Sequence, residues 1–160
     1  MSGIQIKQIT LQEITDLQKI SKETFFETYA AGNTEEDMKR YLEEEFASDK
    51  LISELKDQNS EFYFALFENK IVGYLKINFG HSQTDIHDEN SLEIQRIYVL
   101  KQYQGKRIGK LLYQKALEIA KQKKLDYLWL GVWEENPKAI QFYEKVGFVA
   151  FDKHVFKLGE

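Results

Sequence analysis

The stretch from residue 92 to residue 120, LEIQRIYVLKQYQGKRIGKLLYQKALEIA, changes its hydrophobic period half-way along. Its first part, around 94–100, is rich in β-branched, aromatic and aliphatic side chains and predicts a β-strand. From 108 to 120 the apolar residues recur at helical spacing, so a strand runs into a helix. The connector 104–109, QGKRIG, holds two glycines, which destabilise a helix start unless bare backbone is needed there. Because the first N–H groups of a helix have no internal partner, the pattern indicates a site for an anion, phosphate above all.

Three phosphate-binding designs use a turn of this kind, and the residues around Gly109 separate them. A P-loop is excluded because Gly109 is followed by Lys110 and Leu111, without the Ser or Thr that it requires. The dinucleotide fingerprint is disfavoured because it needs three glycines early in the chain and an acidic residue after the next strand. The remaining pattern, Gln/Arg-x-x-Gly-x-Gly/Ala after a strand, resembles the pyrophosphate-binding motif of the GNAT acetyltransferases. Arg107 stands where that family most often has its first glycine, but it still offers a backbone N–H and adds a guanidinium near phosphate.

A second strand-to-helix unit, residues 125–148, strengthens the resemblance to the GNAT family. A glycine-containing turn alone is equally well explained as an ordinary helix start, but two motifs in the right order and at the right separation favour the family. The likeness covers at least 62–158, and the N-terminal third fits in arrangement only. Segments 92–94, 96–98 and 130–134 are most similar to bacterial spermidine/spermine N-acetyltransferases. The second motif, Asn-x-x-Ala-x-x-Phe/Leu-Tyr followed by Gly-Phe, is matched by Asn136, Ala139, Phe142, Tyr143, Gly147 and Phe148.

The resemblance implies a fold, a cosubstrate and a set of binding residues. The implied fold is one mixed α/β GNAT domain over 1–160, with a central, mostly antiparallel twisted sheet of six to seven strands, about four flanking helices and splayed central strands. Acetyl-CoA is the implied cosubstrate, and direct transfer needs no metal. The residues expected to bind it are Ile97, Tyr98 and Val99 through the backbone, Gln104, Gly105, Lys106, Arg107, Ile108, Gly109 and Lys110 around the pyrophosphate, and Asn136 and Tyr143 from the second motif.

Glu93 is the predicted general base. A primary amine with a pKa near 10.4 is neutral in only about one molecule per thousand at pH 7, so a base has to take a proton before or during attack. An acid in a mostly apolar strand breaks the local pattern, which tends to mark function or strain. Its position also resembles that of the glutamate base of some GNAT enzymes. A water chain, which other members use, and a plain carboxylate at a strand edge or paired with Arg96 stay open as alternatives.

Tyr143 resembles the family's tyrosine that protonates or hydrogen-bonds the leaving thiolate. The alternative is a core tyrosine with a satisfied hydroxyl, which is the usual state of a tyrosine on a buried helix face. The acetyl carbonyl would be polarised by backbone N–H groups near 97–99, which need no side-chain signature.

Composition restricts the class of protein. The 160 residues carry a formal net charge of −4 and no cysteine, which excludes disulfides, zinc thiolates and a cysteine nucleophile and fits a cytoplasmic protein. No apolar run reaches the length of a membrane span and 1–9 holds no signal-peptide core, so no membrane partner is expected. The charge argues against nucleic acid and is compatible with a cationic small substrate. His81 and His87 lie among acids without the spacing of a known metal site, so we expect no metal.

Ahead of the central stretch, the sequence predicts a strand, three helices and a hairpin. Helices are expected from about 11 to 30 after Thr10, after Thr34, and after Ser48, with a first strand at 4–9 and antiparallel strands at 61–68 and 71–79. In the family this region forms one wall of the acceptor pocket. It is either an acidic, aromatic-lined site for an amine or a set of amphipathic helices with solvated acids. The residues concerned are Phe25, Phe26, Tyr29 and Tyr41, with Glu23, Glu27, Glu35, Glu36 and Asp37 nearby.

After the central stretch, the chain is expected to depart from the family. A strand at 125–133 is followed by a helix that begins at Pro137 and is terminated by Gly147. Residues 148–158 predict a sixth strand, and we expect the family's seventh strand to be absent. The alternatives are two short strands around 152–153 and a last strand supplied by a partner.

These features predict an acetyl-CoA-dependent N-acetyltransferase that acts directly on the primary amine of a small substrate. A polyamine such as spermidine or spermine is the leading acceptor. Two alternatives stay open: a peptide or protein N-terminus or lysine as the acceptor, and a non-catalytic domain that binds acetyl-CoA as a regulator. Family members are often dimers, so a homodimer is compatible with the sequence.

Overall fold

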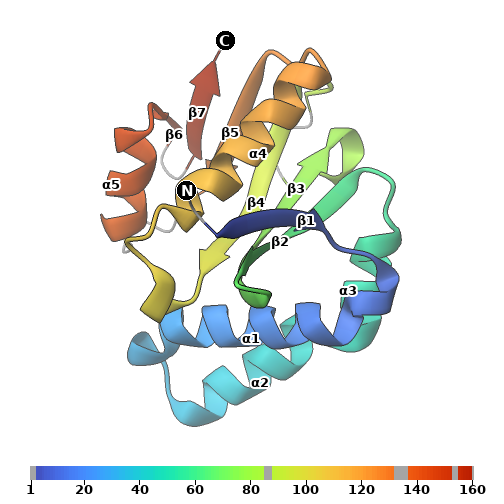
Figure 1. The fold of residues 1–160 in the computed structure, drawn as a ribbon, viewed down its shortest axis with the longest axis vertical. Coiled ribbons are helices and arrows are strands. Elements are labelled where there is room, and N and C mark those ends of the chain that lie inside the picture. The colour runs from blue at the N-terminus through green and yellow to red at the C-terminus, as the bar shows by residue number, and fades with distance from the viewer. Residues whose placement is uncertain (1–2, 85–87, 132–136, 153–154, 160) are drawn as a thin grey trace.

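Figure 1 shows the computed structural model, which describes residues 3–84, 88–131, 137–152 and 155–159. The strands are β1 (Ile4–Gln8), β2 (Ser60–Phe67), β3 (Lys70–Phe79), β4 (Ser91–Val99), β5 (Tyr127–Gly131), β6 (Val149–Asp152) and β7 (Val155–Gly159). The α-helices are α1 (Ile14–Tyr29), α2 (Glu35–Glu45), α3 (Ser48–Lys56), α4 (Ile108–Gln122) and α5 (Pro137–Lys145). Short 3-10 helices lie at η1 (Leu11–Glu13), η2 (Ala30–Gly32), η3 (Gly80–Ser82) and η4 (Lys101–Tyr103).

The strands form one sheet in the order β1-β2-β3-β4-β5-β7-β6. Neighbouring strands are antiparallel except for β4 and β5, which are parallel. The mixed, mostly antiparallel sheet expected from the sequence is confirmed. The expectation that a seventh strand is absent is wrong, because 148–158 holds two short strands in place of one. β7 pairs with β5 from Tyr127↔Gly159 to Gly131↔Val155, and β6 pairs with the other edge of β7.

The hairpin of β2 and β3 forms as predicted, and its turn residues explain how it closes. The ladder runs from Ser60↔Asn78 to Phe67↔Lys70. Between the strands, Glu68 and Asn69 have positive φ angles of 51° and 67°. Two successive residues with positive φ are what a type I′ turn requires, and that turn matches the twist of the strands.

The N-terminal helices begin close to their predicted positions. Thr34 caps α2 as expected, because its hydroxyl accepts a hydrogen bond from the Asp37 N–H at 3.1 Å. Thr10 precedes η1, and α1 follows directly, so the helix predicted over 11–30 starts as a 3-10 turn. The predicted cap at Ser48 is wrong by one position, since Ala47 occupies the N-cap of α3.

Different helices cover the two faces of the sheet (Figure 1). On the face of α4 and α5, apolar side chains of β3 and β4 such as Leu75 and Ile94 join Leu112 in one core cluster. On the face of α1 and α3, a second cluster includes Leu51 and Phe64. Successive side chains along a strand point to opposite faces, so β3 and β4 contribute to both clusters.

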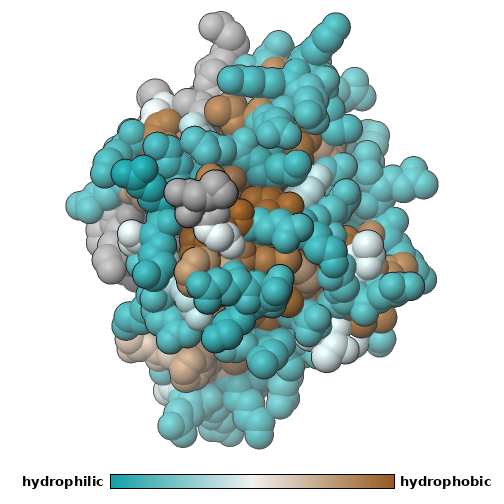
Figure 2. Space-filling view, in the orientation of Figure 1, coloured by the Kyte–Doolittle hydropathy of each residue, from teal (hydrophilic) through white to brown (hydrophobic). Residues whose placement is uncertain are grey.

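The surface is largely polar on the face seen in Figure 2, where hydrophobic residues gather near the middle of the view, around the start of β1. Among the described large apolar side chains, Leu11, Phe26 and Tyr41 are exposed, at 43%, 51% and 45%. Across the described ranges, no helix has the length and apolar character needed to span a bilayer.

Candidate active site

The parallel ladder between β4 and β5 is short. It joins 91–93 of β4 to 127–129 of β5, although β4 continues to Val99 and β5 to Gly131. The described residues of β5 offer no partner to β4 beyond Glu93. The two central strands therefore diverge after Glu93, as the resemblance to the GNAT family implied, and we call the space between them the opening.

The backbone of Ile97 and Val99 faces this opening. The Leu100 N–H donates to the Val72 carbonyl of β3 at 2.8 Å, and successive N–H groups along a strand point in opposite directions. The N–H groups of Ile97 and Val99 therefore point away from β3, toward the side where β5 has diverged. The N–H of Tyr98 points toward β3. Of the three residues predicted to present N–H groups, two direct them to the opening.

The connector between β4 and α4 adopts a conformation that most side chains avoid. Gly105 has a φ of 84°, and Arg107, the residue that departs from the family's glycine, has a φ of 67°. The Gln104 side chain donates to the Val99 carbonyl at 3.1 Å, and Ile108, only 1% exposed, anchors the connector in the core. The connector is thus held at both ends, with its exposed part between them.

The first turn of α4 presents backbone N–H groups that have no hydrogen-bond partner among the described residues. The Leu111 N–H donates to the Arg107 carbonyl at 3.1 Å, so the N–H groups of Ile108, Gly109 and Lys110 precede the hydrogen bonds within the helix. Arg107, at the N-cap, makes no capping hydrogen bond with its side chain. A helix N-terminus without a cap is positive and suits an anion.

Helix α5 lies against this turn. It begins at Pro137, and Gly147 follows its end with a φ of 109°, as predicted. A Cβ atom added to Gly109 would lie 3.8 Å from the Cζ atom of Phe142. The start of α4 and the middle of α5 are therefore in contact. Asn136, predicted to bind acetyl-CoA, lies outside the described residues.

Tyr143 is buried on α5, next to the connector. It is 8% exposed, and its ring packs edge-to-face on Phe142 and Phe148, at centroid distances of 5.4 and 5.7 Å. Burial, with a smaller effect from Tyr29, raises the pKa of Tyr143 above its ordinary value. The hydroxyl therefore keeps its proton at neutral pH and is a hydrogen-bond donor.

Glu93 is held at the point where the strands diverge. It is 3% exposed and lies opposite Trp129, in the last pair of the β4–β5 ladder. Its Oε1 atom accepts hydrogen bonds from Asn78 Nδ2 at 2.9 Å and from the Thr84 N–H at 2.8 Å. Its Oε2 atom accepts a hydrogen bond from the Thr84 hydroxyl. These contacts fix the orientation of the carboxylate.

A cluster of buried charges, which the sequence analysis missed, lies on the same face of β4 as Glu93. Arg96, considered as a partner of Glu93, binds Glu54 with both guanidinium nitrogens, at 2.9 and 3.3 Å. Glu45 lies 3.8 Å from Arg96. Lys76 of β3, 6% exposed, has its ammonium 3.6 Å from the Glu54 carboxylate. The cluster fastens α3 to the sheet.

Lys76 is expected to make stability depend on pH. Burial, followed by the charge of Arg96, lowers the pKa of Lys76 from 10.5 to about 8, although Glu54 opposes the shift. Between these two pKa values the unfolded chain binds more protons than the folded one, so stability rises with pH through this window. The rise from pH 7 to pH 9.5 should be about 2 kcal/mol in urea denaturation. Lys76→Met should remove this rise in the free energy of unfolding, whereas Lys50→Met, at a 44% exposed side chain, should retain it. A parent protein whose stability did not rise between pH 7 and pH 9.5 would contradict the lowered pKa of Lys76.

Aromatic side chains of α1 and α2 reach the end of β4. Phe25 stacks on Tyr41 with ring centroids 4.7 Å apart and lies 4.4 Å from Tyr29. Burial, with the neighbouring Tyr29 and its hydrogen bond, raises the pKa of Tyr98 well above the usual range. We call Phe25, Tyr29 and Tyr41 the aromatic wall; Phe26 is exposed on the same helix as Phe25. The wall reaches from the exposed ring of Tyr41 to β4 beside the opening.

The sequence pattern of the Acetyltransferase (GNAT) family matches residues 14–148. The match includes the connector, the opening and Tyr143. The chain belongs to the GNAT acetyltransferase family. As a GNAT enzyme, it is an N-acetyltransferase that depends on acetyl-CoA.

Relatives and solved structures agree with membership of the GNAT family. The chain is 39% identical over 160 residues to an uncharacterized N-acetyltransferase in the pepI 3′ region of Lactobacillus delbrueckii subsp. lactis, covering 100% of this chain and 92% of that protein. It is 26% identical over 154 residues to spermidine N(1)-acetyltransferase of Thermoplasma acidophilum, covering 94% and 91%. The crystal structure of PaiA N-acetyltransferase from Thermoplasma acidophilum, in complex with coenzyme A, superposes with a TM-score of 0.86 at 24% identity over 100% of both chains. This last likeness shows the fold.

The opening and the first turn of α4 fit acetyl-CoA on three grounds. The N–H groups of Ile97 and Val99 lack a strand partner among the described residues and suit an extended ligand. The first turn of α4 suits a diphosphate. Lys106, Arg107 and Lys110 are exposed around that turn and add positive charge. Within the part of the chain that the structure describes, no group of three or more His, Cys, Asp or Glu residues could hold a metal ion.

Arg107→Gly is expected to change stability and acetyl-CoA affinity of the GNAT enzyme in opposite directions. A left-handed conformation costs a residue with a Cβ atom about 1 kcal/mol, so glycine should raise the free energy of unfolding by about 0.5 to 1 kcal/mol. Loss of the guanidinium should weaken acetyl-CoA binding about three- to tenfold. Urea denaturation and titration calorimetry measure the two effects. An unchanged affinity would remove the Arg107 side chain from the site.

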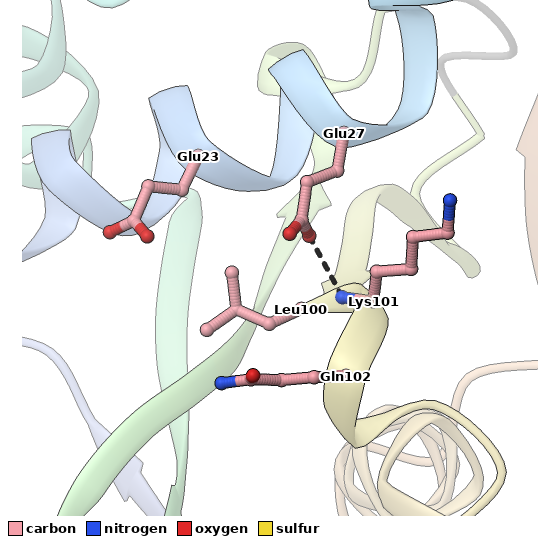
Figure 3. Close-up of a pocket in the computed structure, with 5 residues that line it drawn as sticks. All are labelled: Glu23, Glu27, Leu100, Lys101 and Gln102. Atoms are coloured by element: carbon pink, nitrogen blue, oxygen red, sulfur yellow. Dashed lines mark hydrogen bonds between the residues drawn. The ribbon is translucent and has the colours of Figure 1, made fainter.

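Two surface hollows of this GNAT enzyme lie beside η4, away from the opening. One, of about 470 Å³, is shown in Figure 3, and the other, of about 500 Å³, extends from it toward the β2–β3 turn. The Glu27 carboxylate accepts the Lys101 N–H at 2.8 Å, which ties α1 to η4 (Figure 3). Neither hollow is lined by the connector or by Ile97 and Val99, so neither coincides with the residues predicted to bind acetyl-CoA. The first is lined by Glu23, Glu27, Leu100, Lys101 and Gln102.

Proposed function

We propose that this GNAT enzyme acetylates a primary amine of a small polycation, with spermidine or spermine as the leading substrate. The observation that carries the proposal is the aromatic wall, which runs from the exposed ring of Tyr41 through Phe25 and Tyr29 to Tyr98 beside the opening. Aromatic faces attract alkylammonium groups. Glu35, Glu36 and Asp37, exposed in the first turn of the helix that carries Tyr41, add negative charge that favours a polycation over a neutral amine.

The relationship to spermidine N(1)-acetyltransferase of Thermoplasma acidophilum supports the same class of acceptor. That relationship extends over 94% of this chain, so it includes the wall as well as the acetyl-CoA site. At 26% identity it supports the class of substrate and leaves the choice among polyamines to experiment.

The proposed chemistry divides the proton transfers between two sides of the opening. Glu93 accepts a proton from the acceptor ammonium, directly or through a water molecule, so that the neutral amine can attack. Acetyl-CoA supplies the acetyl group as a thioester, and the N–H groups of Ile97 and Val99 polarise its carbonyl. Tyr143, which its raised pKa keeps protonated at neutral pH, donates its proton to the departing sulfur, and the second proton that the nitrogen loses as the amide forms replaces it. Gln104 to Lys110 hold the diphosphate.

Release of coenzyme A with spermidine, spermine and a short lysine peptide tests the proposal. Spermidine or spermine should give the highest kcat/KM. A preference for the peptide would move the assignment to protein or peptide acetylation. Binding of acetyl-CoA in a calorimeter without release of coenzyme A for any amine would indicate a regulator without turnover. The homodimer stays a prediction, which light scattering would check. The cytoplasmic location also stays a prediction.

Tyr143→Phe is expected to lower kcat about tenfold and to leave acetyl-CoA affinity within about twofold of the parent. The substitution removes only the hydroxyl, because the ring contacts with Phe142 and Phe148 do not depend on it. Steady-state kinetics and calorimetry measure the two values. Tyr113→Phe is the matched control, since Tyr113 packs on the same Phe148 and its hydroxyl bonds only weakly to the Val146 carbonyl, at 3.4 Å. Equal rates for parent and Tyr143→Phe would leave Tyr143 as a core residue.

A further inference from the structure

β4 carries one extra residue where its pairing with β3 shifts. The register changes between Lys76 and Ile77 of β3, so that Gln95 of β4 has no opposite residue. Such a β-bulge bends its strand and re-aims the residues that follow. This one lies two positions after Glu93, the last residue of β4 that pairs with β5. The bulge therefore stands where the opening begins.

The bulge also decides which side chains share a face. Ile94 and Ile97 both pack in the cluster under α4, although they are three residues apart. Because alternation would place residues three apart on opposite faces, the extra residue restores Ile97 to the same face as Ile94. Gln95 and Arg96 consequently both lie on the face of α3, where Gln95 meets Lys76.

A chain of buried and partly buried hydrogen bonds connects the bulge to Glu93. The Gln95 Oε1 atom accepts from the Lys76 ammonium at 2.6 Å and from Asn78 Nδ2 at 2.8 Å. The same Asn78 Nδ2 donates to Glu93 Oε1 at 2.9 Å, and the Ser60 hydroxyl donates to Asn78 Oδ1 at 2.8 Å. Asn78 is fully buried and Lys76 is 6% exposed. The Asn78 amide and the Gln95 Oε1 atom therefore have defined positions.

Such a network lowers stability relative to an apolar core of the same volume. Burying the Lys76 ammonium and the Asn78 amide costs free energy that apolar side chains at the same positions would not, and a buried polar network is robust only when every member is satisfied. In return, it specifies one arrangement. If the Asn78 amide turned over, its bonds to Glu93, Gln95 and Ser60 would be lost together, so the bulge and the carboxylate cannot move independently.

We propose that Lys76, Asn78 and Gln95 form a positioning network that fixes the β4 bulge, and that this network sets both the direction of the Ile97 and Val99 N–H groups and the place of the Glu93 carboxylate. The three residues act through the groups that they hold. The part that concerns Glu93 rests on the proposed function, whereas the part that concerns the backbone rests only on acetyl-CoA binding at the opening.

Gln95→Leu tests the network, because leucine has a similar size and cannot accept from Lys76 or Asn78. We expect coenzyme A affinity to fall about tenfold in a calorimeter and kcat with spermidine to fall by a further tenfold, since small misplacements of reacting groups cost large factors in rate. Gln95→Glu retains both acceptor positions and should stay within about threefold of the parent. Leu51→Ala, at a fully buried apolar residue of α3, is the control for lost stability and should keep both values in the folded protein.

Lys76→Met provides a second variant if Gln95→Leu does not fold, and both together give a double-mutant cycle. If the residues act through their contact, the double variant should be about as impaired as the worse single one, so the effects are not additive. Parent-like coenzyme A affinity and kcat in both single variants would overturn the proposal. So would a Leu51→Ala variant that lost as much of either value as Gln95→Leu. If the parent enzyme acetylated no amine, only the polyamine proposal would be refuted. The measured coenzyme A affinities would still decide whether the positioning network exists.

Discussion

Replacing Glu93 with glutamine is expected to lower kcat for amine acetylation about 100-fold near pH 7, with a smaller loss at high pH where more of the amine is already neutral. Glutamine at position 93 can keep the hydrogen bonds that Glu93 makes, so the substitution should remove the carboxylate's charge without changing its surroundings. Its Oε1 atom accepts from two fixed donors, Asn78 Nδ2 and the Thr84 N–H, and the oxygen of a glutamine can take that place. The new amide nitrogen would then face the Thr84 hydroxyl, which can rotate to accept.

The measurement is a profile of kcat and kcat/KM against pH for the parent and Glu93→Gln. Glu118→Gln, at a 57% exposed side chain on α4, controls for the loss of one negative charge. Melting temperatures of the three proteins should agree within a few degrees if the network around Glu93 is conserved. A profile of Glu93→Gln that superimposes on the parent would leave Glu93 as a structural carboxylate, and a water chain would then carry the proton.

Gly109→Glu should reduce acetyl-CoA affinity about 100-fold while leaving the fold intact. The new carboxylate would stand in the first turn of α4, where it repels a diphosphate and occupies the backbone N–H groups that would bind it. A loss of this size corresponds to one or two charge-assisted hydrogen bonds. The same carboxylate favours helix stability, because negative charge suits the N-terminus of a helix. Binding and stability should therefore respond differently.

Titration calorimetry and thermal unfolding measure the two responses. Gly109→Ala is the matched control, since an added Cβ atom would meet only Phe142 Cζ, at an ordinary contact distance of 3.8 Å. The alanine variant should bind acetyl-CoA within a few-fold of the parent. If Gly109→Glu bound acetyl-CoA as tightly as the parent, the connector would not be the pyrophosphate site.

Local pattern was sufficient to predict the centre of the fold. The change of period within 92–120 located β4 and α4, and Thr34 and Pro137 marked helix starts that the structure confirms. The sequence also contains a signal of the bulge. Gln95 and Arg96 are adjacent polar residues between Ile94 and Ile97, and they interrupt the alternation of apolar and polar residues. Such a double polar step in a strand with two buried faces signals an extra residue.

Contacts between distant segments could not be predicted in the same way. The hydrogen-bond partners of Glu93 come from β3 and from the segment after η3. No spacing in the sequence predicts that Asn78 and Thr84 both contact Glu93. Lys76 and Asn78 are polar residues in a buried strand, which was a signal of a buried network, but their partners depend on the register with β4. The left-handed conformation of Arg107 was hidden because the residue is not a glycine.

The C-terminal strands were misjudged for a different reason. β6 spans 149–152 and β7 spans 155–159, and runs this short show too few alternations to be separated by pattern. What defines β7 is its pairing with β5, which begins 28 residues earlier in the chain at Tyr127 and is fixed only by tertiary structure.

The position of β7 between β5 and β6 has a consequence for how the protein is made. β5 and β6 are synthesised before β7, the strand that lies between them in the sheet. Until β7 pairs, one edge of β5 has free N–H and C=O groups. Unpaired edges of this kind recruit other strands. A folding intermediate in which β7 is not yet paired should therefore be prone to association with other chains, and pairing of β7 completes the sheet between β5 and β6.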